Sequence, residues 1–327
     1  MPTFGIEEEV FVVEGRHPSP KAMLYLTRLL WQDPRRNYSL TASNFSRGKD
    51  LFEGVMSGVE IATRVHGSAA DALDDLAGRR QELASVTDAM LVPIGHLLDL
   101  DSPTNTCALH VHVGNVTDTA RTLRNFIYFL PVLTLLTVNS PCARAHRVGQ
   151  SYRIMRSFAL GPLRDDPYYR FQDVIISRRL GTIELRVFDP TWDPARLRVL
   201  LGCIEAISRT QRDYHGRIEE YNELRHAVAA RGYVEELERV FVELNDLYPV
   251  PKHLLTHTCS DVVWLYSRQE GIERTYSGMD NAYRTGVFEP TARPAQQFER
   301  VGFVAGLAGY YVPKLPYIAW KAWREWH

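Results

Sequence analysis

Residues 4–13 read FGIEEEVFVV, so three consecutive glutamates stand inside an otherwise apolar segment. Apolar side chains recur at every second position, and this period predicts a β-strand. Successive side chains of a strand point to opposite faces, so Glu7 and Glu9 share one face, roughly 7 Å apart along the backbone. Two carboxylates that face the same space need a cation or an arginine between them. Glu8 lies on the apolar face, where we expect an internal arginine partner or a position near the strand end.

Two further predicted strands, 55–65 and 181–188, carry charged side chains on the face opposite their apolar one. Each charge taken alone is typical of the solvent-facing side of an antiparallel strand. Together they gather hard oxygen ligands without cysteine, which favours Mg²⁺ or Mn²⁺ over zinc. The charged residues are Glu60 on the first strand, Glu53 upstream near its start, and Glu184 and Arg186 on the second.

The predicted strand 108–113 carries two histidines, His110 and His112, on one face. An H-x-H pair on a strand can hold a metal ion or donate hydrogen bonds to an anion. The same pattern also fits a pair of core or surface histidines. The acidic strands are what make the functional interpretation worth testing.

Basic residues gather in segment 139–153, NSPCARAHRVGQSYR, which contains three arginines and a histidine. Arginine binds carboxylates and phosphates through two parallel hydrogen bonds. A solvated surface loop would give the same composition, so both interpretations stay open. Asn281 and Arg284 form a weaker case of the same kind.

The composition excludes several classes of protein. The chain has 327 residues, 45% of them hydrophobic and 24% charged, with a formal net charge of -1. This balance gives no reason to expect nucleic acid or a membrane surface as a partner. Four scattered cysteines without C-x-x-C spacing predict reduced, packed thiols. We find no secretory leader and expect a cytoplasmic protein. The sequence leaves open whether it forms a homo-oligomer.

The pattern of predicted elements favours an α+β fold with an antiparallel sheet, because each strand alternates polar and apolar residues. Residues 68–71 have the signature of a capping box at a helix N-terminus, and helical periodicity dominates residues 194–247. Residues 33–50 are polar and rich in breakers, which predicts a long loop. No linker divides the chain, so we expect one domain over residues 1–327.

Five motifs in a fixed order give a resemblance to a known family. GIEEEV, SGVEIAT, ALHVHVG, the NSP-to-SYR segment and GTIELRVFDP together resemble the second glutamate–cysteine ligase family, in its bacterial carboxylate–amine ligase branch. The resemblance implies a fold like the catalytic domain of glutamine synthetase, with an antiparallel sheet curved into a funnel and helices on its convex face. It also implies that Mg·ATP phosphorylates a carboxylate, which an amine then attacks to form an amide.

The resemblance also implies roles for individual residues. Arg186 corresponds to an arginine that stabilises the transferring phosphoryl group, and Arg153 to a basic residue near substrate or phosphate. His110 corresponds to the site histidine, at the metal or the cofactor, and the fainter motif 281–284 places Asn281 and Arg284 near the cofactor. The implied metal ligands are Glu7, Glu9, Glu53, Glu60, His110 and Glu184.

Two other functions remain open from the sequence. One is a metal-dependent hydrolase that uses His110 and His112, and the other is a non-catalytic relative of the ligase fold. A non-catalytic relative has no physical reason to keep mutually repelling carboxylates on one face. We therefore expect a ligase that joins an amino acid to an amine of unknown identity. The expected product is an amide, with a γ-glutamyl bond as the expected linkage.

Overall fold

The computed structural model describes residues 1–19, 21–32, 40–42 and 58–291, with a few isolated positions beyond residue 303. The predicted ligand Glu53 lies outside the described residues, as does most of the tail after residue 298. The predicted loop 33–50 is described only at Leu40–Ala42, where it forms a strand. The loop prediction is wrong there, because these residues pair with the edge of a neighbouring strand.

The sheet is antiparallel, as the alternating patterns predicted. Its strands are β1 (Thr3–Glu14), β2 (His17–Pro18), β3 (Leu40–Ala42), β4 (Gly58–Ala62), β5 (Met90–Val92), β6 (Leu109–Gly114), β9 (Val174–Ser177) and β10 (Thr182–Phe188). The main order is β3-β4-β1-β6-β10-β9, with β2 and β5 also paired to β1. Within the described residues this path ends at β3 and β9 and does not close on itself. A separate hairpin joins β7 (Cys142–Ala143) to β8 (His146–Arg147).

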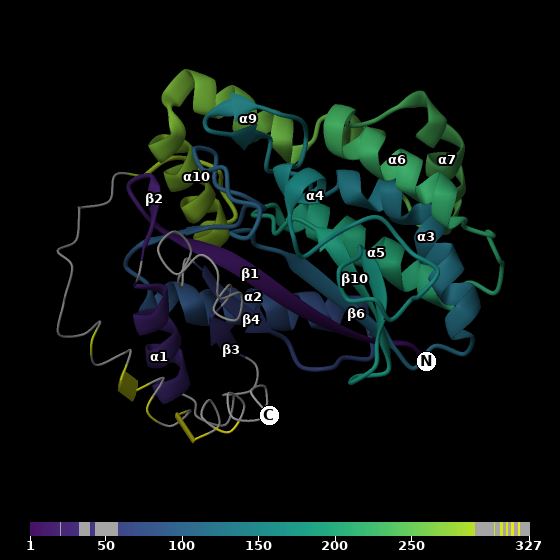
Figure 1. Cartoon of the computed structure of the whole chain (residues 1–327), viewed down its shortest axis with the longest axis horizontal. Helices are drawn as coiled ribbons and strands as arrows, with labels where there is room; N and C mark the ends of the chain where they lie inside the picture. Colours follow the sequence, from purple (N-terminus) through teal and green to yellow (C-terminus); the bar gives the residue numbers. More distant parts are fainter. Residues whose placement is uncertain are drawn as a thin grey trace.

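The helices complete an α+β arrangement (Figure 1). They are α1 (Ala22–Gln32), α2 (Ala69–Val86), α3 (Thr119–Leu135), α4 (Tyr152–Arg156), α5 (Pro194–Arg209), α6 (Ile218–Arg231), α7 (Glu238–Leu247), α8 (Lys252–Thr256), α9 (Cys259–Glu270) and α10 (Ile272–Thr285), with a short 3₁₀ helix at Glu235–Leu237. The predicted N-cap is confirmed, because the Ser68 side chain accepts a hydrogen bond from the Asp71 N–H. Contacts of α2 with β1 and β4, and of α3 with β10, place these helices against the sheet.

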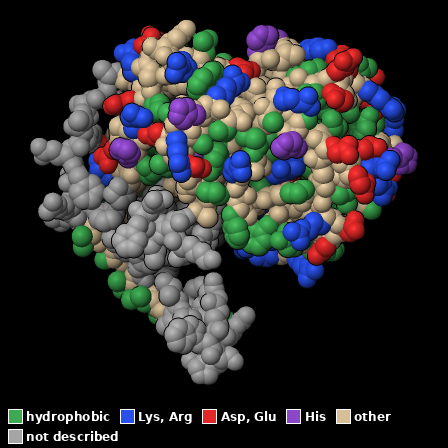
Figure 2. Space-filling model, turned by 45° about the horizontal axis from the view of Figure 1, so that its top comes forward, with side chains coloured by type: hydrophobic (Ala, Val, Ile, Leu, Met, Phe, Trp, Pro, Cys, Tyr) green, Lys and Arg blue, Asp and Glu red, His purple; other side chains and the backbone are tan. Residues whose placement is uncertain are grey.

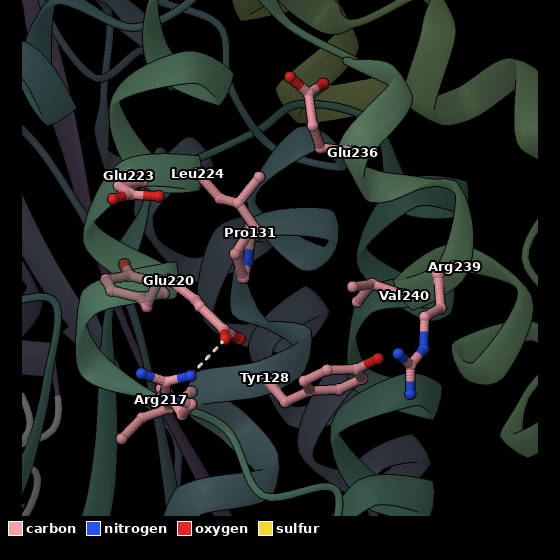
Figure 3. Close-up of a pocket in the computed structure, with 11 residues that line it drawn as sticks. Tyr128, Pro131, Arg217, Glu220, Glu223, Leu224, Glu236, Arg239 and Val240 are labelled. Carbon is pink, nitrogen blue, oxygen red and sulfur yellow. Dashed lines mark hydrogen bonds and ion pairs between the residues drawn. The ribbon is translucent and has the colours of Figure 1, made fainter.

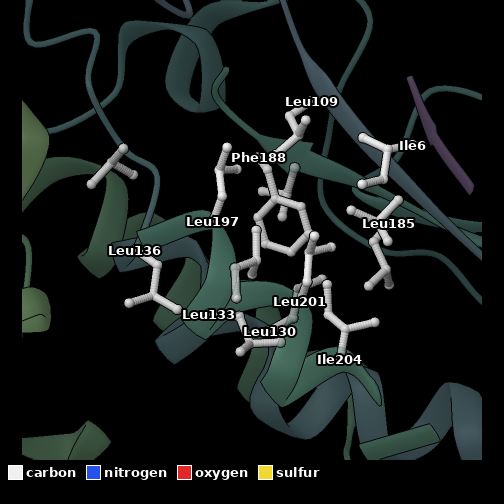
Figure 4. Close-up of a cluster of buried hydrophobic side chains, with 14 of the residues drawn as sticks. Ile6, Leu109, Leu130, Leu133, Leu136, Leu185, Phe188, Leu197, Leu201 and Ile204 are labelled. Carbon is white, nitrogen blue, oxygen red and sulfur yellow. The ribbon is translucent and has the colours of Figure 1, made fainter. Parts of the chain in front are cut away.

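The main hydrophobic core lies between the sheet and these helices. The even-numbered apolar residues of β1, such as Ile6 and Val10, point into it. Figure 4 shows Phe188 of β10 surrounded by leucines of α3 and α5. The alternation of β1 therefore buries its apolar side chains on the helix-covered face, which leaves Glu7 and Glu9 on the other.

A second core covers the opposite face of β1, further along the strand. Phe11 and Val13 are fully buried there, against Tyr276 and Met279 of α10. These two residues lie on the same face as Glu7 and Glu9, because all four are odd-numbered. One face of β1 thus changes midway from carboxylates to a packed core.

Glu8 has the arginine partner that the sequence predicted. Its carboxylate is fully buried on the apolar face and accepts two hydrogen bonds from Arg80 of α2, one of them 2.9 Å from Nε. Tyr283 of α10 donates a third, at 3.2 Å, and its ring lies under the guanidinium. Burying a charge is costly unless it is paired, so this pair fixes α2 against β1.

Removing one partner of this pair should destabilise the fold strongly. Arg80→Met leaves the Glu8 carboxylate buried without its counter-ion, and we expect a loss of about 3–5 kcal/mol in the free energy of unfolding. The double variant Glu8→Met with Arg80→Met should be more stable than the single one, because no unpaired charge remains. Urea unfolding measures both; equal stabilities of the single and double variants would contradict this account.

His96 is the buried histidine of the second core region. It is inaccessible to solvent and its ring stacks on Tyr152, with centroids 3.8 Å apart. The Ser102 N–H donates to its Nε2 at 3.2 Å, which requires this nitrogen to be unprotonated. Burial lowers the pKa of His96 to about 4, so the folded protein keeps the ring neutral at mildly acidic pH.

This histidine should make stability depend on pH. Above pH 6.5 the ring is neutral in both states; as the pH falls towards 4 only the unfolded chain binds the proton, so the stability present above pH 6.5 is lost. We expect about 3 kcal/mol of loss over this window from this residue. His96→Gln cannot titrate, so its unfolding free energy should fall less than that of the wild type. Parallel pH dependences of the two proteins would contradict the prediction.

The surface agrees with the neutral composition. Figure 2 shows acidic and basic side chains interspersed over the visible face. Among the helices of the described residues, none combines the length and apolar character that a membrane span requires. All four cysteines are buried free thiols, as predicted.

Candidate metal and phosphate site

Strand register brings the predicted site residues together on one face of the sheet. Glu7 of β1 lies opposite His110 of β6, and Glu184 of β10 lies opposite His112. Glu9 lies opposite Glu60 of β4. Residues that are far apart in the sequence thus meet across four adjacent strands, and they form what we call the carboxylate cluster: Glu7, Glu9, Glu60, His110, His112, Glu184 and Arg186.

The side chains at the centre of the cluster lie within a few ångströms of each other. Glu7 Oε2 is 3.5 Å from Nδ1 of His110 and 3.5 Å from Nε2 of His112. Glu184 Oε1 is 3.7 Å from His110 Nδ1 and accepts a hydrogen bond from Arg186 at 2.6 Å. All of these residues except Glu7 are less than 10% exposed, so water does little to screen their charges.

Three of these residues offer a metal site. Within the described part of the chain, one ligand atom each of Glu7, His112 and Glu184 lies within 4.8 Å of the others. The sequence left open whether His112 is a ligand and favoured His110; the geometry favours His112. Nε2 of His112 is buried and makes no hydrogen bond among the described residues, although Oε2 of Glu7 lies 3.5 Å away, so this nitrogen is available to a ligand.

The other nitrogen of His112 has a partner. Nδ1 lies 3.2 Å from the hydroxyl of Thr182, the first residue of β10. Metal-bound histidines commonly use their second ring nitrogen in this way, which fixes the orientation of the ring. Sequence reasoning missed Thr182, although period two places it on the same face as Glu184 and Arg186.

Neighbouring charges set the protonation states of the cluster. Burial would raise the pKa of Glu7, but the two histidines 3.5 Å from its carboxylate hold that pKa well below its usual value. Burial lowers the pKa of His110. For His112 burial acts in the same direction, yet Glu7 and Glu184 outweigh it and its pKa rises. Before any cation binds, Glu7 is therefore ionised, and the pKa values of the two histidines are shifted in opposite directions.

Arg186 supplies positive charge beside the carboxylates. Its side chain is 7% exposed, and Nε has no hydrogen-bond partner in the described structure. A buried N–H without a partner is costly unless a ligand accepts its hydrogen bond. The arginine predicted to contact phosphate thus has one buried donor still to satisfy.

The structure places the other predicted site residues elsewhere. Arg284 donates to Asp280 at 2.8 Å and to backbone carbonyls that include Ala84 at 2.6 Å. Asn281 donates to the Val287 carbonyl, just beyond α10. No contact in the described structure joins these two side chains to the carboxylate cluster, and the cofactor contacts that the resemblance implies stay a prediction. Both residues anchor α10 through backbone hydrogen bonds.

A separate groove of about 300 Å³ lies on the helical layer, between α3, α6 and α7 (Figure 3). Pro131 and Val240 contribute apolar side chains to it. On its rim Arg217 donates to Glu220 at 3.1 Å, and Arg239 pairs with Glu243 at 3.3 Å. Because these arginines already have carboxylate partners, we do not assign the groove to the candidate site.

Solved structures share this fold at low sequence identity. Glutamate–cysteine ligase from Francisella tularensis, in complex with AMP, matches with a TM-score of 0.59 and 14% identity, over 94% of this chain and 92% of that chain. A bifunctional glutathione synthetase from Pasteurella multocida matches with a TM-score of 0.57 and 12% identity, over 87% of this chain. This chain spans about half of that synthetase, 51% of its length. No protein-family model matches the chain, and no curated protein matches its sequence.

The contact between Thr182 and His112 generates a prediction about metal affinity. Thr182→Val removes the hydroxyl but keeps the shape, and we expect Mn²⁺ to bind about 10- to 100-fold more weakly. Thr182→Ser should bind as the wild type does, and His112→Ala should lose the ion. Electron paramagnetic resonance of free Mn²⁺ measures all three; equal affinities of the valine variant and the wild type would remove Thr182 from the site.

Proposed function

We propose that this protein is an ATP-dependent carboxylate–amine ligase whose active site is the carboxylate cluster. The observation that carries the proposal is that two buried nitrogens, Nε2 of His112 and Nε of Arg186, make no hydrogen bond in the described structure although Glu7 and Glu184 lie beside them. One atom suits a cation and the other suits an anion. A cation-bound phosphate satisfies both atoms, and the fold shared with the two ligases supports this interpretation.

The residues of the cluster fit a divalent cation. Glu7, His112 and Glu184 would hold Mg²⁺ or Mn²⁺, with Glu9 and Glu60 on the adjoining strands as further candidates. When bound, the cation supplies positive charge to phosphate oxygens. It would also offset the repulsion between carboxylates that face each other across strands. Binding requires His112 to lose its proton, so affinity for the cation should rise with pH.

The chain's own contribution to the reaction is positioning and charge. In the proposed first step an oxygen of the substrate carboxylate attacks the γ-phosphorus of ATP, and the bond from that phosphorus to the bridging oxygen of ADP breaks. Arg186 would donate hydrogen bonds to the transferring phosphoryl oxygens, where charge is spread in the transition state. In the second step the amine attacks the acyl carbon of the acyl phosphate, inorganic phosphate leaves, and the amine loses a proton.

The finer features of the proposal follow the sequence resemblance. We propose a single catalytic domain over residues 1–327, with the sheet as the wall of a funnel and glutamate or a related amino acid as the acid. The described residues give less support to the hydrolase alternative, because their converging group contains one histidine and not both. A purified protein with stoichiometric, tightly held zinc would favour the hydrolase instead.

The test is Mg²⁺-dependent release of ADP in an array that pairs amino acids with amines. Glu184→Gln keeps the size of the side chain but removes its charge, and we expect the rate to fall by about 100-fold or more. Glu219→Gln, whose side chain is 73% exposed on α6, serves as the control and should keep the wild-type rate. Full activity of the Glu184 variant, or a wild type that binds neither Mg·ATP nor glutamate at millimolar concentrations in calorimetry, would refute the proposal.

A further inference from the structure

We propose that Arg153 is a positioning residue that sets the direction of Arg186, and that it does not touch the substrate. This inference rests on the proposed function for its kinetic consequence only, because the contacts that carry it are structural. It revises the role near phosphate that the sequence resemblance implied for Arg153.

The first observation is a β-bulge at the catalytic end of β10. The strand pairs regularly with β6 as far as Leu185, opposite Val111, and pairing resumes at Phe188, opposite Leu109. Arg186 and Val187 therefore face a single residue of β6, so the regular ladder of backbone hydrogen bonds is interrupted there. Such bulges re-aim side chains, and here Val187 and Phe188 both enter the main core although they are consecutive.

The second observation is that Arg153 takes the place of the missing ladder. From α4, its NH2 group donates to the Arg186 carbonyl at 2.8 Å, and its NH1 group donates to the carbonyls of Val187 and Phe188 at 3.0 and 3.1 Å. On the other side, the Arg186 N–H donates to the Asp173 carbonyl at 2.8 Å. Both backbone polar groups of Arg186 are thus held by residues outside β6.

The third observation is that Arg153 is locked in place. Its side chain is 2% exposed, and the buried carboxylate of Asp189 lies 3.6 Å from NH1. Asp189 in turn accepts hydrogen bonds from the Asn139 N–H at 3.1 Å and the Ser140 hydroxyl at 2.9 Å. A side chain at Gly95 would collide with this carboxylate, so the surrounding backbone is shaped to admit it.

These contacts distinguish positioning from substrate binding. An arginine that binds phosphate through its terminal nitrogens needs free N–H donors there, but three of these N–H groups of Arg153 already donate to backbone carbonyls. Arg186, in contrast, has a buried Nε without a partner in the described structure. A change at Arg153 would therefore shift the backbone of Arg186 and move its guanidinium relative to Glu184. Misplacement by about 1 Å can slow catalysis by about 100-fold while binding survives.

The experiment compares two buried arginines that perform the same kind of structural task. Arg153→Lys keeps a positive charge near Asp189 but cannot span three carbonyls. Arg196→Lys is the matched control, because Arg196 is 6% exposed, pairs with Asp193 and donates to two carbonyls around α8. For both variants we would measure kcat and KM of ADP release, Mn²⁺ binding, and amide hydrogen exchange over residues 182–189.

For Arg153→Lys we expect kcat to fall by about 100-fold, with KM for ATP within about two-fold of the wild type. Exchange of the Arg186 amide should be at least ten-fold faster, and Mn²⁺ binding should show that the protein is folded. The Arg196 variant should change neither kcat nor exchange in β10 by more than two-fold, although its melting temperature falls. Asp189→Asn, which removes the counter-charge and replaces one acceptor oxygen with an amide NH2 group, should act like Arg153→Lys, with a smaller effect.

The outcomes separate the two proposals. A wild type that forms no ADP with any acid and amine would end the ligase proposal, while exchange in β10 would still decide the positioning one. Unchanged exchange in a folded Arg153→Lys variant would overturn the positioning role. A raised KM for ATP with unchanged kcat would also overturn it, because Arg153 would then be a binding contact.

Discussion

The alternation of side chains along β1 is the constraint on which the rest of the structure depends. Even-numbered residues such as Ile6 and Val10 enter the main core, so the odd-numbered Glu7 and Glu9 must share the opposite face. A register shift of one residue would bury the carboxylates against the helices and expose the core side chains. The position of the site is thus fixed by the same burial that stabilises the fold. Antiparallel pairing then carries the polar face across to β6 and β10.

Charged side chains have different partners on the two faces of the sheet. Behind the sheet, Glu8 is neutralised by Arg80, and nearby Asp173 accepts hydrogen bonds from Arg225 and from the Tyr221 hydroxyl. On the polar face the carboxylates meet histidines at 3.5 Å or more, and two buried nitrogens lack partners within the described residues. Buried atoms without a hydrogen bond also occur away from this face, such as Nε of Arg79, so what marks the polar face is that two such nitrogens lie beside carboxylates.

The sequence predicted most of this arrangement wherever period two governs it. The strand at β1, the pairing of Glu8 with an arginine, and the shared face of Glu184 and Arg186 are confirmed. Two aspects lay beyond sequence reasoning, because they depend on register and on long-range partners. The preference for His112 over His110 follows from which atoms converge across strands. The task of Arg153 follows from a bulge that no alternation reveals, since a bulge breaks the period.

The C-terminal motif, residues 281–284, lies on α10, and its described contacts are with the fold. The resemblance implies that residues 281–284 lie near the cofactor, which stays a prediction; the described contacts show that α10 contributes side chains to both cores. Tyr283 reaches Glu8 behind the sheet, and Tyr276 packs in the second core beside Phe11. Asp280 accepts a hydrogen bond from the Leu91 N–H, so the same helix is also hydrogen-bonded to β5, which pairs with β1. Because β1 also carries Glu7 and Glu9, α10 restrains the strand on which these two glutamates lie. Within the described residues, the helix that carries the motif therefore supports the strand that carries two of the proposed ligands.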